Sequence, residues 1–250
     1  MTMSNLNEAV FASSEIVAAY AKMDGLHRCE QHLFAKYLRP GATILDIGVG
    51  AGRTAPYLAP AAASYIGIDY SEPMIDAARR RFPASDFRWG DAADLSGFEN
   101  ERFDLVLFSF NGMSSIPSDE SRRRALQEVA RVLKPGGNFI FSVSNAEFLI
   151  FLPELREATL KQRIWRCVIS ATKTLGLLWR QLRSGVFFRG EGYLPVPVHK
   201  GMRLYAATPA IISAEAAAAG LSVVEKVDYD CYFDCSRYAV GSWCYVAEKP

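Results

Sequence analysis

The chain has 250 residues, of which half are apolar, 22% are charged and 12% are aromatic, and this profile excludes a disordered, collagenous or fibrous protein. The 28 basic and 27 acidic residues give a net charge of +1, so no whole-molecule attraction to nucleic acid or to acidic membranes is expected. The length allows one large domain or two small ones.

The first eleven residues lack the basic start and apolar core of a secretion signal, and no apolar run approaches the roughly 18 residues of a membrane span. We therefore expect a cytoplasmic protein. Its five cysteines are thinly spread, which fits free thiols in a reducing compartment. Cys231, Cys235 and Cys244 follow the spacing C-x3-C-x8-C, but no histidine cluster matches it, so we favour core thiols and expect no metal.

Along the chain, the first strong pattern predicts one helix over residues 15–38, capped by Ser13 or Ser14. From residue 43 to 145, short apolar runs alternate with helical patterns. This alternation predicts parallel strands joined by crossover helices, and hence an α/β fold with three layers. The predicted strands are residues 43–48, 64–69, 86–91, 103–110 and 138–144, and the helices between them start near Arg53, Ser71 and Ser118.

The third of these helices is expected to stop at Pro135, after which Gly136 and Gly137 turn the chain into the next strand. Near the C-terminus, Thr208-Pro209 opens a helix that Gly220 closes. Two last strands are predicted within residues 221–227 and 237–249.

Residues 146–202 interrupt this rhythm and are interpreted as a helical cap inserted over one edge of the sheet. The core fold then comprises residues 15–145 and 203–250 of a single domain. Residues 151–190 carry a net charge of +6, which leaves the rest of the chain at −5. Residues 187–197, rich in glycine and proline, are expected to form a mobile lid loop.

The strongest motif is the glycine-rich segment from Asp46 to Gly52, DIGVGAG, at the predicted end of the first strand. Glycines there let a ligand lie against the main chain at the carboxyl ends of the strands. A dinucleotide site would have G-x-G-x-x-G, whereas the third glycine here follows the second by only two positions. A carboxylate two residues before the first glycine also suits a cationic ligand better than a pyrophosphate.

The motif D-x-G-x-G-x-G resembles the first motif of the class I S-adenosylmethionine-dependent methyltransferases. The similarity continues through YIGIDYS, WGDAADL, FDLVLFSFNGM and EVARVLKPGGNFIFSVSN, and resumes at RLYAATP. It implies a Rossmann-like, doubly wound sheet of seven mostly parallel strands, and S-adenosylmethionine as the cofactor. The insertion at 146–202 matches no family pattern.

The resemblance assigns roles by the parts of that cofactor. Asp46 would face the methionine amino group, directly or through water, while Gly48, Gly50 and Gly52 make room for the ligand. Asp69 would accept the two ribose hydroxyls. The remaining positions are Asp91 and the Ala92 amide at the adenine edge, Tyr70 and Met74 on its faces, and Phe108, Ser109 and Tyr20 around the methionine part.

Methyl transfer from a sulfonium is an in-line displacement in which alignment supplies much of the acceleration, so a general base is needed only for an acceptor that must lose a proton. His199, at the end of the insertion, is the candidate base, and Tyr205 near it is a further catalytic candidate. Asn111 follows a strand end and is a candidate for orienting the acceptor. The Asn/Asp-Pro-Pro-aromatic sequence of nucleic-acid amine methyltransferases is missing, which favours a small-molecule acceptor.

Residues 161–183 form an amphipathic pattern with a basic face. We favour a lid helix that packs its apolar face on the sheet edge; the alternative is peripheral contact with a membrane surface. Three functions remain open: an enzyme on a soluble small molecule, an enzyme on a membrane lipid, quinone or saccharide intermediate, and a cofactor-binding protein without turnover. The oligomeric state is not readable from the sequence.

Overall fold

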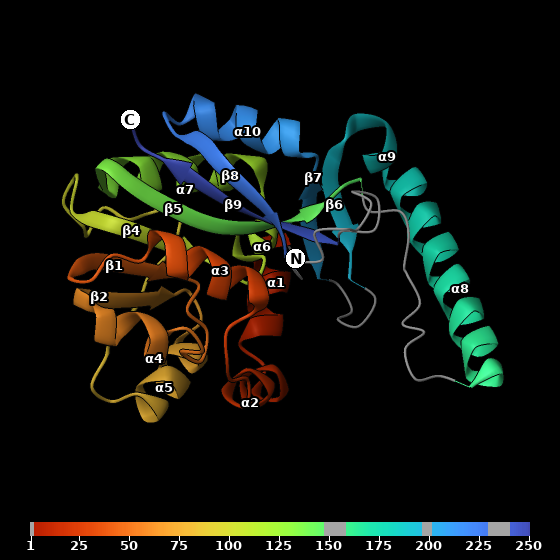
Figure 1. The fold of residues 1–250 in the computed structure, drawn as a ribbon, viewed down its shortest axis with the longest axis horizontal. Helices are drawn as coiled ribbons and strands as arrows, with labels where there is room; N and C mark the ends of the chain where they lie inside the picture. Colours follow the sequence, from red (N-terminus) through yellow and green to blue (C-terminus); the bar gives the residue numbers. More distant parts are fainter. Residues whose placement is uncertain (1–2, 148–158, 197–201, 230–240) are drawn as a thin grey trace.

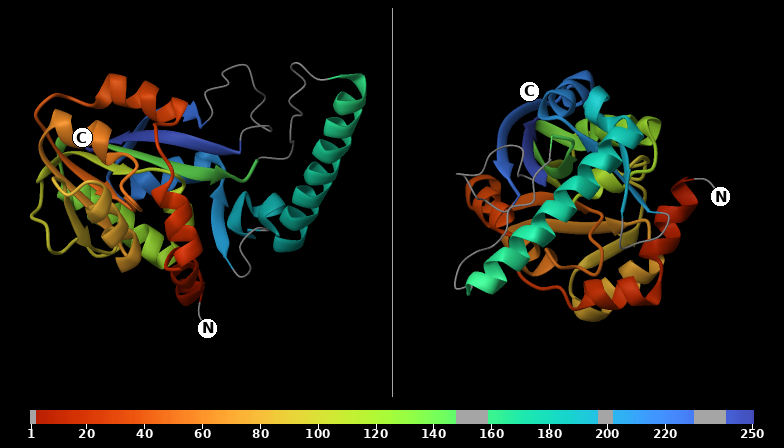
Figure 2. Two further views of the ribbon diagram at one scale, coloured as in Figure 1. Left: turned by 90° about the horizontal axis from the view of Figure 1, so that it is seen from below. Right: turned by 90° about the vertical axis from the view of Figure 1, so that its right-hand side faces the viewer.

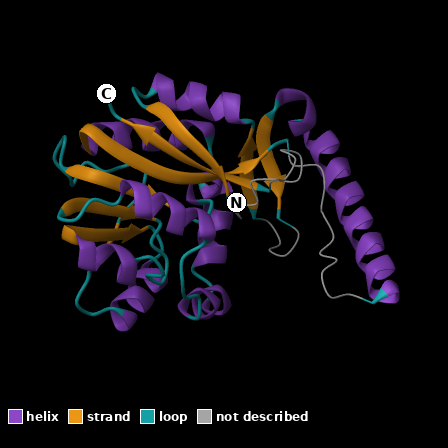
Figure 3. Ribbon diagram, in the orientation of Figure 1, coloured by secondary structure: helices purple, strands orange, loops and turns teal. Residues whose placement is uncertain are grey.

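The computed structural model describes residues 3–147, 159–196, 202–229 and 241–250. One sheet runs through the middle of the molecule, and helices cover both of its faces (Figures 1 and 3). The three-layer α/β architecture predicted from the alternating pattern is therefore confirmed.

Seven strands form the expected core of the sheet, in the order β3-β2-β1-β4-β5-β9-β8. β9 runs antiparallel to both of its neighbours, and the other adjacent pairs in this order are parallel. Two further strands, β6 and β7, form a hairpin that adds to the end of β5. The strands are β1 (Ala42–Ile47), β2 (Ala62–Asp69), β3 (Asp86–Trp89), β4 (Phe103–Phe108), β5 (Leu133–Asn145), β6 (Glu191–Pro195), β7 (Arg203–Ala207), β8 (Ser222–Asp228) and β9 (Ser242–Glu248).

The helices fall at the expected crossovers, with several short additions. The predicted crossover helix near Arg53 is only one turn, whereas those after Ser71 and Ser118 are full helices. The helices are α1 (Met3–Phe11), α2 (Ser14–Ala21), α3 (Arg28–Tyr37), α4 (Ala55–Leu58), the 3-10 turn η1 (Ala59–Ala61), α5 (Glu72–Arg81), α6 (Gly112–Ser115), α7 (Asp119–Val132), α8 (Leu160–Ser184), α9 (Val186–Arg189) and α10 (Pro209–Ala218).

Side chains on the two faces of the sheet build two hydrophobic cores. Leu45 and Ile47 of β1 point into the core shared with α7 and α10, whereas Ile44 points into the core shared with α3, α4 and α5. Successive residues of a strand face opposite sides, so one strand contributes to both cores. Asp46, between Leu45 and Ile47, therefore faces the side of α3 and α4.

Two expected boundaries are wrong. The helix predicted over residues 15–38 is broken into α2 and α3, because Gly25 takes a positive φ of 78° that a helix does not allow. The helix starting after Ser118 ends at Val132, three residues before Pro135, since the β5 ladder already begins at Leu133.

The described part of the insertion forms α8, α9 and strand β6, and β6 pairs with β7 of the core fold. α8 begins with a capping box at Thr159 and ends at Gly185 in the left-handed region. It runs diagonally across one end of the molecule, beyond β6 and β7 (Figure 2). Residues 187–196, expected as a mobile loop, form the end of α9 and strand β6, because β6 pairs with β7 along five residues.

The apolar face of α8 does not pack on the sheet edge, so the prediction of an ordinary lid helix is wrong. Ile164, Trp165, Leu175 and Trp179 are each at least 59% exposed. Within the described ranges, no helix is long and apolar enough to cross a membrane.

Candidate active site

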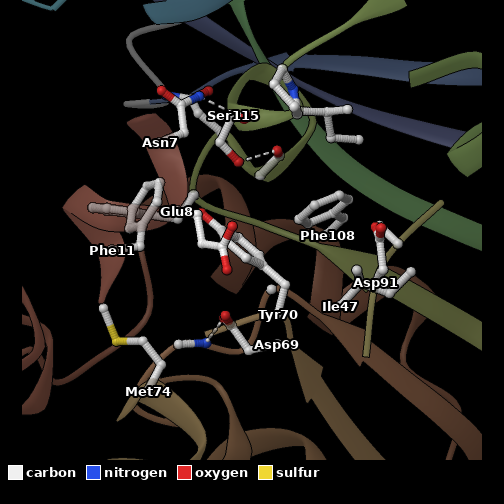
Figure 4. A pocket seen from close by; sticks show the side chains of 18 of the residues that line it. Asn7, Glu8, Phe11, Ile47, Asp69, Tyr70, Met74, Asp91, Phe108 and Ser115 are labelled. Atoms are coloured by element: carbon white, nitrogen blue, oxygen red, sulfur yellow. Dashed lines mark hydrogen bonds between the residues drawn. The ribbon is translucent and has the colours of Figure 1, made fainter. Parts of the chain in front are cut away.

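A cavity of about 580 Å³ opens where β1, β2 and β4 end (Figure 4). The N-terminal helix α1, the short helix α6 and strand β7 complete its wall. Among the described residues that line it, the charged side chains are Glu8, Asp69 and Asp91, all acidic, and no lysine, arginine or histidine is present. The cavity is therefore electrostatically suited to a cation and unsuited to a pyrophosphate.

The glycine loop presents its backbone to this cavity. Gly48 and Gly50 have positive φ values of 62° and 55°. A Cβ at Gly48 would lie 2.6 Å from Cε2 of Phe108, and one at Gly50 would lie 3.2 Å from Cδ1 of Tyr20. Any larger residue would be strained and would also push these rings, so glycine keeps the loop open to a ligand.

Asp69 lies at the end of β2 with both carboxylate oxygens aimed at backbone amides. The Gly50 amide donates to Oδ2 and the Ser71 amide donates to Oδ1, each at 2.9 Å. Burial raises the pKa of Asp69 to about 6, although the two amide hydrogen bonds act to lower it. Each oxygen keeps a further lone pair, so the ionised carboxylate can still accept two hydroxyl groups from a ligand.

Aromatic and apolar side chains flank the region beside Asp69. Four predicted adenine-side positions line the cavity here: Tyr70, Met74, Asp91 and Ala92. Trp89 lines it as well, with its indole Nε1 donating to the Tyr70 carbonyl at 2.9 Å. The Tyr70 hydroxyl is buried without a hydrogen-bond partner in the described part of the chain, and such an unmet polar atom fits a ligand-binding wall.

A buried ion pair braces the two sides of the cavity. Glu30 of α3 accepts from both terminal nitrogens of Arg53, at 2.7 and 2.6 Å, and from the hydroxyl of Ser109. Burial opposes ionisation of Glu30, yet the Arg53 guanidinium holds the pKa of this carboxyl below its usual value. Because Arg53 follows the glycine loop and Ser109 follows β4, this one carboxylate ties three segments together.

The far end of the cavity is mainly apolar. Ile116, Pro117, Val196, Met202 and Leu204 line it. These side chains come from the segment after α6 and from the β6–β7 hairpin, neither of which the glycine motif would reveal.

The polar groups near that end are only partly engaged with the protein, because Asn111 Oδ1 is buried without a hydrogen-bond partner in the described part of the chain. Asn111 starts α6 with a positive φ of 60°, and its Nδ2 donates to Ser242 Oγ at 3.1 Å. The Ser115 hydroxyl donates to the Gly112 carbonyl at 2.7 Å. Asn111 still lines the cavity, and its acceptor-orienting role stays a prediction.

Ten of the twelve predicted cofactor positions line the cavity, and their contacts with a ligand stay predictions. Sequence reasoning missed other lining residues, among them those of the apolar end and those of α1 and β3. α1 lies before the segment from which the fold was predicted, and Trp89 was an unmarked part of the third strand. The missed residues of α1 and β3 are Asn7, Glu8, Phe11 and Trp89.

Asp46 and Gly52 do not line the cavity, although Asp46 was predicted to face the ligand directly or through water and Gly52 to make room for it. Asp46 Oδ2 accepts from the Thr54 hydroxyl at 2.5 Å and the Tyr65 hydroxyl at 2.9 Å. Burial raises the pKa of Asp46 to about 7. Gly52 turns the chain against Phe82, whose ring lies 2.9 Å from where a Cβ would be. Strand alternation and the turn of the loop explain both placements.

Tyr205, a predicted catalytic residue, is also outside the cavity. Cζ of Arg122 lies 3.4 Å from the centroid of the Tyr205 ring, and the Tyr205 hydroxyl donates to Glu191 Oε2 at 2.5 Å. Successive residues of β7 face opposite sides, so Tyr205 points away from the cavity that its neighbour Leu204 lines. His199 lies outside the described residues, between Val196 and Met202, which both line the cavity.

The described cysteines are free thiols. The Cys244 thiol donates to Cys29 Sγ at 2.9 Å in the core, while Cys231 and Cys235 lie outside the described residues. In the described ranges, no group of three or more histidine, cysteine or acidic side chains is placed to hold a metal ion.

Comparison with known proteins agrees with this geometry. Residues 44–137 match the family described as methyltransferase domain. The fold resembles the CcbJ methyltransferase from Streptomyces caelestis, with a TM-score of 0.64, 20% identity and coverage of 96% of this chain and 97% of that one. The chain therefore has the class I methyltransferase fold and resembles the S-adenosylmethionine-dependent members of that class.

Two curated relatives resemble part of the chain. A demethylmenaquinone methyltransferase from Clavibacter sepedonicus is 38% identical over 40% of each chain. A phthiotriol/phenolphthiotriol dimycocerosates methyltransferase from Mycobacterium tuberculosis is 35% identical over 61% of this chain and 51% of its own. The chain thus matches about half or less of the length of these relatives.

Proposed function

We propose that this protein is an S-adenosylmethionine-dependent methyltransferase that acts on an apolar small molecule. The observation that carries this proposal is the single cavity in which an open glycine loop and acidic lining meet an apolar end. When bound, the cofactor supplies an electrophilic methyl group on a sulfonium. Its positive charge suits a cavity whose described charged lining groups are all carboxylates.

The residues present fit this cofactor part by part. The open backbone at Gly48 and Gly50 leaves room for it, and Asp69 has lone pairs left for the ribose hydroxyls. Tyr70, Met74 and the Trp89 indole offer apolar surface to the adenine.

The acceptor class follows from the opposite end of the cavity. Ile116, Pro117 and Met202 offer apolar contacts, while Asn111 and Ser115 already donate within the protein. A quinone or lipid acceptor fits this lining better than a saccharide, because a saccharide would bury more hydroxyls than the unpartnered Asn111 Oδ1 could satisfy. The relatives named for demethylmenaquinone and phthiotriol dimycocerosates support the same class.

The cofactor choice is tested by thermal unfolding with S-adenosylmethionine or NAD. At about a hundred times its dissociation constant, a bound ligand adds about 2.7 kcal/mol, or roughly 5 to 11 °C for a chain of this size. We expect this rise in melting temperature with S-adenosylmethionine and none with NAD. A rise with NAD alone would contradict the cofactor assignment.

Turnover is tested by measuring S-adenosylhomocysteine release with reduced quinones, hydroxylated lipids and saccharides. Release with the apolar acceptors and none with saccharides is expected. Tight cofactor binding without release on any acceptor would favour the alternative of a cofactor-binding protein without turnover.

His199 remains the proposed base for an acceptor that must lose a proton. A general base contributes about 100- to 10,000-fold, and an unperturbed imidazole titrates near pH 6.5. We expect His199→Gln to lower kcat about 100-fold or more and to remove the decline in kcat on the acid side, with cofactor affinity unchanged. An unaltered pH profile of kcat would remove this role.

A further inference from the structure

The long helix of the insertion, α8, is attached to the body along one side. Ser170, Leu177 and Gln181 are its buried residues, and they lie seven and four positions apart on one face. The Gln181 Nε2 donates to the Ala146 carbonyl at 3.0 Å. This attachment leaves the opposite face of α8 turned outward.

That outward face is apolar along the whole helix. Leu160, Ile164, Val168, Leu175, Trp179 and Leu182 repeat at spacings of three, four or seven, which places them in one stripe. Val168, Leu175 and Trp179 each lie two positions before a buried residue, about 200° around the helix from it. The stripe therefore faces solvent, because it lies on the side of the helix opposite the buried residues.

The amount of apolar surface is unusual for this molecule. The described residues contain thirteen large apolar side chains that are exposed, and nine of them lie between residues 160 and 188. Trp165 is 65% exposed, and Phe188 of α9 is 77% exposed. Exposed apolar side chains that gather in one segment in this way mark an interaction surface. At 1.5 Å per residue, residues 160–182 span about 33 Å.

The charge around the stripe selects the partner. Residues 160–190 contain seven lysines and arginines and no acidic residue. Lys161 and Arg183 lie near the two ends of the stripe, and the Arg183 guanidinium packs over the Trp179 ring at 5.1 Å. Arg166, Lys173 and Arg180 form a row on the opposite side of the helix. The helix is about 10 Å wide, so the distance from this row to a surface that contacts the stripe is about one Debye length.

We propose that α8 and α9 dock the protein on the surface of a bilayer that contains anionic lipids, with the apolar stripe lying in the interface plane. Aromatic and aliphatic side chains on one face and basic groups around it are the features of interfacial helices. A second copy of the chain would have to bring two sets of seven positive charges together. The charge therefore favours an anionic membrane over self-association.

The docking helix is continuous with the cavity wall. α8 leads through α9 into β6, and Val196, directly after β6, lines the cavity, as do Met202 and Leu204 on the β7 side. In a protein bound to a membrane through α8, the membrane contact and the apolar wall of the cavity would therefore belong to one continuous segment of the chain. This inference goes beyond methyl transfer, and it is tested without cofactor or acceptor.

The test is co-sedimentation of the full chain with vesicles of about equal parts phosphatidylglycerol and phosphatidylcholine, and with vesicles of phosphatidylcholine alone. We expect binding to the anionic vesicles that weakens at high salt. Trp165→Ser with Trp179→Ser should lower partitioning about tenfold or more, because two aromatic anchors are lost. The matched control is Tyr57→Ser with Val224→Ser, two exposed apolar positions elsewhere, which should bind as the parent does.

Charge reversal gives a second, independent arm. Lys161→Glu with Arg183→Glu should lower partitioning roughly tenfold or more, because each basic group near an anionic surface contributes about 1 kcal/mol, and about 1.4 kcal/mol is a factor of ten. Arg123→Glu with Arg124→Glu changes the net charge equally on exposed positions of α7 and should have little effect. Circular dichroism of each variant checks that the fold is kept.

Lipid-borne quenchers locate the contact. Tryptophan fluorescence of the parent should be quenched by brominated lipids, and Trp165→Phe with Trp179→Phe should keep binding while losing most of that quenching. Failure to bind anionic vesicles would overturn the proposal, as would binding that neither the serine nor the glutamate pair weakens. A dimer in sedimentation equilibrium that the Trp→Ser pair dissociates would assign the stripe to self-association instead.

Discussion

Replacing Asp69 by asparagine is expected to weaken S-adenosylhomocysteine binding roughly 100-fold at pH 7.5. The ionised carboxylate already accepts from the Gly50 and Ser71 amides and has lone pairs left for two ribose hydroxyls. The neutral amide loses the charge and one acceptor oxygen. Isothermal titration calorimetry measures the change. Asp76→Asn, an exposed carboxylate on α5, is the control and should bind as the parent does.

The same residue predicts a pH dependence of binding. Burial raises the pKa of Asp69 to about 6 in the free protein, so the carboxylate is ionised at pH 7.5 and largely protonated at pH 5. A protonated carboxyl accepts hydroxyl donors less well. Affinity should be full above about pH 7 and fall by up to about tenfold toward pH 5, whereas the asparagine variant should lack this dependence. Equal affinity of parent and variant at pH 7.5 would remove Asp69 from the ribose site.

Replacing Glu30 by alanine is expected to destabilise the protein by about 3 to 5 kcal/mol. The Arg53 side chain is 11% exposed, and the substitution leaves its guanidinium buried without its carboxylate. For a chain of this length, the melting temperature should fall by roughly 6 to 20 °C. Thermal and urea unfolding measure the loss.

Two further variants test whether the loss of stability comes from burial of the Glu30–Arg53 pair or from the loss of any ion pair. Glu30→Ala with Arg53→Ala should recover part of the stability, because no unpaired charge remains inside. Asp86→Ala removes the exposed pair with Arg88 and should cost less than about 1 kcal/mol. A loss below about 1 kcal/mol for Glu30→Ala, or a double variant less stable than the single one, would contradict a structural role for the pair.

The pH dependence of this contribution has a definite sign. Arg53 holds the pKa of Glu30 below its ordinary value of 4.5 despite burial. The stability that Glu30 provides is therefore present above about pH 4.5 and is lost as the pH falls through the lowered pKa.

The local patterns of the sequence were sufficient for the layers and the ligand loop. Short apolar segments that end near Asp46 and Asp69, with a helical pattern between them, predicted a parallel sheet. The spacing of the three glycines predicted where the ligand of that sheet lies. These features depend on short-range rules: side-chain alternation, capping and backbone freedom at glycine. They hold in any tertiary setting, so the sequence alone could give them.

Only the tertiary structure decided which faces meet. Glu30, Arg53 and Ser109 lie far apart in the chain and form one brace because α3 packs over the loop and β4. Asp46 and Tyr205 turn away from the cavity because alternation along β1 and β7 assigns them to other layers. The period of α8 revealed an apolar face, but whether the body covers that face depends on how the helix is attached. The attachment is through Gln181 on the opposite side.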